Sequence, residues 1–151
     1  SATVVYLFSG TILNTVILAA VMGMVAGMGG NAGTQALAVT VRVIAMERGT
    51  GRRHGVVIGR EILVGLVNGA VLGAIVSTAA YLLEGDPRLG LVVFLAMWGN
   101  QMVASLVGSV VPTVLDRLGI DPAVASSVFV TACTDLCGFL FLLGLATSIL
   151  M

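Results

Sequence analysis

Four long apolar segments are the feature that most constrains how this chain can fold. They cover residues 10–46, 57–83, 89–115 and 122–151, and each exceeds the roughly 20 residues that a helix needs to cross the hydrocarbon core of a bilayer. Hydrophobic residues make up 58% of the 151 residues and charged residues only 9%, whereas about a quarter of the residues are charged in soluble proteins. The sequence therefore predicts an all-α, polytopic bundle of transmembrane helices.

Turn and capping signals separate these segments. Gly49-Thr50-Gly51 follow the first segment, and Asp86-Pro87 precede the third. Asp121-Pro122 combine a helix N-cap with a proline at the first helical position, so the fourth helix is expected to begin there. The apolar run 4–8 is too short to span a bilayer, and we interpret it as the tail of a possible fifth helix.

The distribution of arginines predicts the orientation. Five of the seven basic residues cluster around the loop between the first and second segments: Arg42, Arg48, Arg52, Arg53 and Arg60. Because basic loops stay in the cytoplasm, this loop is expected inside the cell and the C-terminus outside, in the inner (plasma) membrane.

Several classes of function are excluded by composition. The formal net charge is zero and lysine is absent, so nothing favours binding to nucleic acid. Cys133 and Cys137 lie four residues apart in an apolar run, where cysteines are packing residues more often than metal ligands. HExxH and GxSxG motifs are absent, and Asp135 is interpreted as the only acidic residue within a span, so an intramembrane enzyme is not expected.

Asp135 is the strongest candidate for a functional residue. It lies near the middle of segment 122–151, where an ionised carboxylate is costly without a partner or a water-filled cavity. All arginines lie in loops or at helix ends, and the single histidine, His54, lies in the first loop. The expected partner is therefore an external cation. The alternative is a protonated Asp135 that is hydrogen-bonded to a neighbouring helix.

Helical spacing predicts two polar stripes that could line a path for this cation. Residues four apart share a helix face, so Ser127, Thr131 and Asp135 form one stripe, which Gly138 continues. A matching stripe in segment 10–46 contains Gly23, Gly27, Gly30 or Asn31, and Thr34. By contrast, the ladder Gly65, Gly69 and Gly73 is typical of helix packing, and Asn68 and Asn100 are expected to form interhelical hydrogen bonds.

The donor atoms of these stripes are hard oxygens. Carboxylate, amide, hydroxyl and carbonyl oxygens favour Mg²⁺, Ca²⁺ or Mn²⁺, and Mg²⁺ suits a wide cavity best because it keeps several of its waters. One carboxylate is little for a divalent cation, so we expect a two-fold homodimer that brings two copies of Asp135 to a pore on the shared axis.

Four stretches carry a resemblance to a known family. The runs "GMGGNAGTQALAVTVR" (27–42), "RE" with "VGLVNG" (within 60–69), "NQMVASLVGSVVP" (100–112) and "GIDPAVASSVFVTACTD" (119–135) occur in the order in which similar runs occur in the membrane domain of the MgtE magnesium channel and transporter family. The resemblance covers nearly the whole chain.

The resemblance implies a homodimer of five-helix domains that passes Mg²⁺ into the cytoplasm. It implies that Asp135 holds hydrated Mg²⁺ in the pore, that Thr131 lies beside it and that Asp121 lies near the cytoplasmic mouth; with Asn31, these are the expected metal-site residues. By this resemblance we expect residues 1–151 to be the pore domain, without the cytoplasmic regulatory modules that usually precede it in the family. Ser9 departs from the family, which usually has an acidic residue there.

The predicted function is a magnesium channel. The alternative is a secondary transporter that exchanges Mg²⁺ for Na⁺ or H⁺, since Asp135 could bind a metal ion and a proton in turn. A non-conducting scaffold is the third possibility, and it would tolerate the substitution Asp135→Asn.

Overall fold

The structure is a computed structural model that describes residues 2–46, 54–124 and 127–150. These ranges contain six α-helices and one short 3₁₀ helix, and no strand. In chain order the elements are α1 (Ala2–Leu7), α2 (Ser9–Asn14), α3 (Ile17–Met46), α4 (His54–Glu84), α5 (Pro87–Arg117), the 3₁₀ helix η1 (Pro122–Val124) and α6 (Ser127–Leu150). The predicted all-α fold is confirmed.

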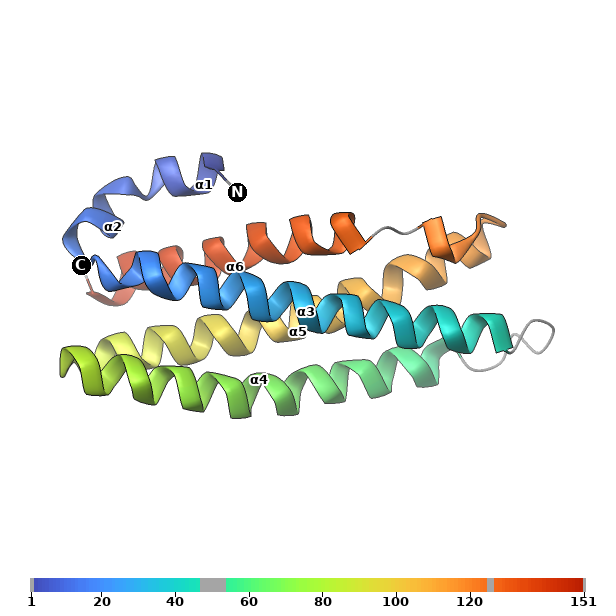
Figure 1. The fold of residues 1–151 in the computed structure, drawn as a ribbon, viewed down its shortest axis with the longest axis horizontal. Helices are drawn as coiled ribbons and strands as arrows, with labels where there is room; N and C mark the ends of the chain where they lie inside the picture. Colours follow the sequence, from blue (N-terminus) through green and yellow to red (C-terminus); the bar gives the residue numbers. More distant parts are fainter. Residues whose placement is uncertain (1, 47–53, 125–126, 151) are drawn as a thin grey trace.

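The long helices α3, α4, α5 and α6 run side by side as an elongated bundle (Figure 1). Each of the four is long and apolar enough to cross a membrane, which confirms the four predicted spans. Helix α5 is the most enclosed, because it packs against α3, α4 and α6. Helix α4 packs mainly on α5 and leaves much of its surface exposed.

The N-terminal residues form two short helices that fold back along α6 (Figure 1). Helix α1 has six residues, too few to span, and its Val4 is buried in the apolar core. The predicted continuous helix from residue 10 is wrong, because α2 ends before Thr15, whose backbone angles are not helical (φ −140°, ψ 81°). A hydrogen bond of 2.8 Å between the hydroxyls of Thr11 and Thr147 ties α2 to α6.

Of the other predicted helix starts, one lies close to the observed start and one does not. The third long helix, α5, begins at Pro87, two residues before the predicted start, and Asp86 caps it: its carboxylate accepts a hydrogen bond of 2.8 Å from the backbone N–H of Arg88. The start of the last helix at Pro122 is wrong, because Pro122 opens η1 instead and the Val124 N–H bonds back to the Asp121 carbonyl at 3.0 Å. Helix α6 begins only at Ser127.

Backbones approach closely in the middle of the bundle. A Cβ atom added to Gly108 of α5 would meet the carbonyl oxygen of Gly33 in α3 and would lie 2.9 Å from the Cβ of Ala36. Such contacts between small residues are how helices pack without side-chain bulk in a membrane. They bring α3 and α5 together between a large apolar cluster around Val25, Val93 and Leu142 and a smaller one around Leu37 and Val130.

Asn100 of α5 forms a hydrogen bond to α3 in the middle of the bundle. Its amide Nδ2 donates a hydrogen bond of 2.9 Å to the Val25 carbonyl oxygen, which confirms the predicted interhelical bond. The side chain is 1% exposed and fits against Gly29 and Gly138, where added Cβ atoms would collide with it. Asn68, the other asparagine predicted to bond between helices, is exposed on α4.

Candidate functional site

A groove along α6 contains the predicted carboxylate. Ser127, Val128, Thr131, Ala132 and Asp135 line this groove, whose volume is about 320 Å³. The i, i+4 spacing therefore places Ser127, Thr131 and Asp135 on one face, as expected. The lining holds one acidic side chain and no basic one. Asp135 itself is partly exposed.

The depth of Asp135 differs from the expectation. Because α6 begins at Ser127, Asp135 lies eight residues into a helix of 24 residues. At 1.5 Å per residue this is about 12 Å from the start of the helix. The carboxylate is thus about a third of the way along α6, on the side of η1, rather than at the middle of the span.

The glycine-rich stripe of α3 adjoins this groove. Gly30 packs against α6, since a Cβ atom there would lie 3.3 Å from Cγ2 of Thr131 and 3.6 Å from its Oγ1. Gly23 and Gly27 are exposed, with nothing within 4 Å of an added Cβ atom. Asn31 is also exposed, and its backbone carbonyl oxygen accepts a hydrogen bond of 2.9 Å from the Thr34 hydroxyl. The two predicted stripes therefore meet where Gly30 packs against Thr131.

Two predicted residues lie outside the groove. Gly138 is buried, and a Cβ atom there would lie 2.8 Å from Nδ2 of Asn100, so this glycine faces the interior of the bundle. Asp121 precedes η1 and is exposed, but it does not line the groove. Cys133 and Cys137 are free thiols and are absent from the lining as well.

A single chain does not complete a metal site here. Within the described ranges no three His, Cys, Asp or Glu side chains come close enough together to hold a metal ion. The groove opens beside apolar side chains that are themselves exposed, with Val128 at 74% and Phe129 at 54%. In a bilayer this surface would set a carboxylate against lipid, which is unfavourable unless another polar surface covers it.

A second polar cavity was missed by sequence reasoning. The interpretation of Asp135 as the only acidic residue in a span is wrong, because Glu61 lies in α4 within the candidate span Gly55–Glu84. Glu61 lines a cavity of about 230 Å³ between α3, α4 and α5, together with Gln35, Asn68, Gln101 and Ser105. The spacing of Glu61, Gly65 and Asn68, which share one helix face, was the signal that could have revealed it.

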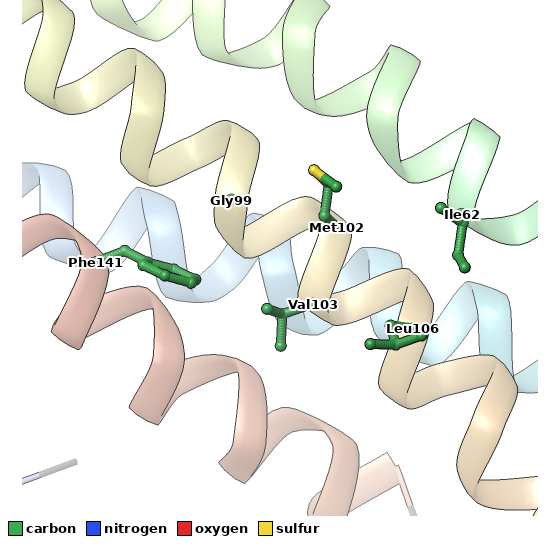
Figure 2. Close-up of a pocket in the computed structure, with 6 residues that line it drawn as sticks. All are labelled: Ile62, Gly99, Met102, Val103, Leu106 and Phe141. Atoms are coloured by element: carbon green, nitrogen blue, oxygen red, sulfur yellow. The ribbon is translucent and has the colours of Figure 1, made fainter.

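A third cavity has the opposite chemistry. Figure 2 shows side chains of α4, α5 and α6 around it, and its volume is about 340 Å³. Its lining consists of Ile62, Gly99, Met102, Val103, Leu106 and Phe141. The Phe141 ring lies over Gly99, where an added Cβ atom would be 3.5 Å away. These side chains offer carbon and sulfur but no oxygen donor, so this cavity is unsuited to a hard cation.

Known transporters are similar to this chain in sequence. The sequence model of the MgtE family, described as a divalent cation transporter, matches residues 22–145. The chain is 37% identical to the magnesium transporter MgtE of Enterococcus faecalis over 147 residues, which are 97% of this chain and 32% of that protein.

Two further relatives carry the same name. The protein of Bacillus subtilis is 31% identical over 148 residues, which are 98% of this chain and 33% of that protein. The protein of Thermus thermophilus is 34% identical over 124 residues, which are 82% of this chain and 27% of that protein. The chain thus spans about a third of the length of the curated relatives that it matches.

Proposed function

The chain belongs to the MgtE family of divalent cation transporters, and from this premise we propose that residues 1–151 form the pore domain of a magnesium channel. Hydrated Mg²⁺ passes down its electrochemical gradient into the cytoplasm along a path lined by α3 and α6. One observation carries the proposal: the Asp135 carboxylate and two hydroxyl side chains share a groove on a membrane-spanning helix.

The groove suits a cation that keeps its water. Mg²⁺ prefers six oxygen ligands and loses its waters reluctantly. At about 30 Å³ per water, a shell of six occupies about 180 Å³. The groove of about 320 Å³ is open on one side, so nothing in this chain forces such an ion to shed its waters. Asp135 and Thr131 then contact the waters of the ion rather than the metal itself.

A second copy of the chain completes the site in this proposal. Two Asp135 carboxylates balance the double charge of Mg²⁺, and the partner covers a groove that would otherwise face lipid. In this proposal the exposed residues Gly23, Gly27 and Asn31 form the remaining wall of the path, because they share α3 with Gly30, which packs against Thr131. We therefore place the pore on the axis of a two-fold homodimer.

The orientation follows from the sequence. The arginine-rich loop between α3 and α4 lies in the cytoplasm and the C-terminus outside the inner membrane. Asp121, beyond the C-terminal end of α5, is then near the cytoplasmic mouth of the path, where a carboxylate attracts cations.

Exchange of Mg²⁺ for Na⁺ or H⁺ is the second candidate function. The observation that favours it is Glu61, a second carboxylate within a span and in a cavity separate from the Asp135 groove. Coupled transport requires a place for the second ion, and intramembrane carboxylates commonly supply one.

Flux measurements separate these functions. The purified chain is reconstituted into liposomes that contain a Mg²⁺-sensitive dye, and empty liposomes serve as the control. A channel is expected to admit Mg²⁺ down its own gradient at a rate that Na⁺ and pH gradients leave unchanged. Flux that requires an opposing Na⁺ or pH gradient would instead establish exchange. Absence of flux from folded protein would leave only a scaffold.

A further inference from the structure

The polar cavity between α3, α4 and α5 is a site in its own right. It shares no lining residue with the Asp135 groove, which belongs to α6 alone. Three helices contribute polar side chains to it: Gln35 from α3, Glu61 and Asn68 from α4, and Gln101 and Ser105 from α5. All of these side chains carry oxygen atoms that can bind a hard cation.

Gln101 contributes a buried oxygen without a hydrogen-bond partner; the Asn100 Oδ1 atom is buried without a partner too, but of the two residues Gln101 lines this cavity. Its side chain is 2% exposed, and within the described part of the chain its Oε1 atom is buried without a hydrogen-bond partner. A buried polar atom left unsatisfied costs about 1–3 kcal/mol, so native structures rarely keep one without a water or ion nearby. A cation in the cavity would satisfy this oxygen, whereas a second acceptor would not.

Close packing of α4 on α5 holds these residues in place. A Cβ atom at Gly65 would collide with the Ser105 hydroxyl and lie 2.9 Å from the backbone carbonyl oxygen of Gln101. Because Glu61 and Asn68 lie four residues before and three residues after Gly65, they share its helix face. The glycine therefore brings a carboxylate and an amide of α4 toward Gln101 of α5.

Charge decides which cation fits. Among the described residues, Glu61 is the one acidic residue in the lining, and none of the lining residues is Arg, Lys or His. Arg60 interacts electrostatically with the Glu61 carboxylate, but its side chain is exposed and does not line the cavity. A monovalent cation neutralises one carboxylate, whereas a divalent cation would leave a net positive charge in a medium of low dielectric constant.

The geometry points to a monovalent cation site of the Na⁺ type in this cavity, formed by the Glu61 carboxylate, the Gln101 Oε1 atom and the neighbouring amide and hydroxyl oxygens. The volume of about 230 Å³ accommodates the ion together with several waters. The inference does not depend on Asp135 or on the direction of Mg²⁺ flux, and it holds for either of the two candidate transport functions.

Trp98 provides a reporter for this site. It is the single tryptophan of the chain, it lies one helical turn before Gln101, and its indole Nε1 donates a hydrogen bond of 3.1 Å to the Leu66 carbonyl oxygen in α4. Binding between α4 and α5 is therefore expected to alter its fluorescence.

The test titrates Na⁺ into the protein in lipid nanodiscs without Mg²⁺, with choline chloride holding the ionic strength constant. The expected result is a saturable change in Trp98 fluorescence and a rise in Tm. Glu61→Gln is expected to raise the apparent Kd for Na⁺ at least 10-fold. Glu84→Gln, which changes the same residue type at the exposed end of α4, should bind like the unmodified protein. Asn68 is exposed, so Asn68→Ala is expected to leave the fold intact, and this variant should also raise the apparent Kd for Na⁺.

Three outcomes would overturn the inference. The first is the absence of a saturable response to Na⁺ or K⁺ in folded protein. The second is a response that Glu61→Gln and Asn68→Ala leave unchanged. The third is a stronger response to MgCl₂ at equal ionic strength, or to pH alone in choline chloride, because a divalent ion or a proton would then occupy the cavity.

Discussion

Replacing Asp135 with alanine is expected to abolish Mg²⁺ flux while the helix bundle stays folded. The side chain is partly exposed in a groove, so its loss removes little packing. In the proposed dimer it removes both negative charges that hold the ion. Because each 1.4 kcal/mol of lost ion binding is a factor of 10, we expect flux to fall by at least about 10-fold. The rate of dye response in liposomes measures the flux, and circular dichroism with Tm checks the fold.

Two further variants make this experiment decisive. Asp135→Glu keeps the charge and should retain part of the flux. Glu84→Ala removes an exposed carboxylate outside the groove and should retain all of it. Unchanged flux in Asp135→Ala would refute the site. Loss of folded protein in Asp135→Ala would instead support a protonated Asp135 that serves packing.

Gly108→Ala is expected to destabilise the bundle by about 1–3 kcal/mol, the usual cost of forcing an extra methyl group into a packed interior. The added methyl group would meet the Gly33 carbonyl oxygen and would lie 3.1 Å from the Leu37 backbone nitrogen. Backbone atoms inside a helix cannot turn aside as a side chain does, so α3 and α5 must separate. Denaturant unfolding in detergent micelles, or the shift in Tm, measures the effect.

Gly144→Ala is the matched control for this substitution. Gly144 lies in α6, and nothing lies within 4 Å of a Cβ atom added there. Alanine also favours a helix over glycine, so Gly144→Ala should leave stability unchanged or raise it slightly. Equal destabilisation by both variants would mean that helix flexibility, and not the contact between α3 and α5, sets the cost at Gly108.

The spans were predictable because length and apolarity alone define a membrane helix. The points where these helices are interrupted were not predictable, because hydropathy carries no information about backbone conformation. Thr15 interrupts the first predicted helix although apolar residues follow it, and the turn at Pro122 adopts a 3₁₀ form before α6 begins. Both errors fall at helix ends, where one residue's backbone angles decide the boundary.

Site residues were predictable as far as they lie on one helix face. Ser127, Thr131 and Asp135 follow from a spacing of four. Gly138 is three residues beyond Asp135, which rotates it about 60° from that carboxylate at 3.6 residues per turn. This rotation turns it toward Asn100, and only the packing of α5 reveals that it lies inside the bundle. The exposure of the α3 stripe likewise depends on which faces α5 and α6 cover.

Glu61 was overlooked for a related reason. Glu61 lies near the start of the predicted segment 57–83, where a carboxylate is usually interpreted as part of the loop or of the membrane surface. Helix α4 begins at His54, so Glu61 lies two turns inside it, and residues of α3 and α5 line the same cavity. The spacing of Glu61, Gly65 and Asn68 reveals the face that α4 contributes, whereas the residues of α3 and α5 join it only through contacts between helices far apart in the sequence.

Locating a bound metal tests the central claim most directly. Mn²⁺, which prefers the same oxygen ligands as Mg²⁺, can be found by anomalous scattering in crystals of the protein. We expect a peak on a two-fold axis between the Asp135 carboxylates of two copies, farther from their oxygens than the roughly 2.1 Å of direct Mg²⁺ coordination, with water between. A structure in which Mn²⁺ binds elsewhere, and in which the Asp135 groove faces lipid, would contradict the proposed pore.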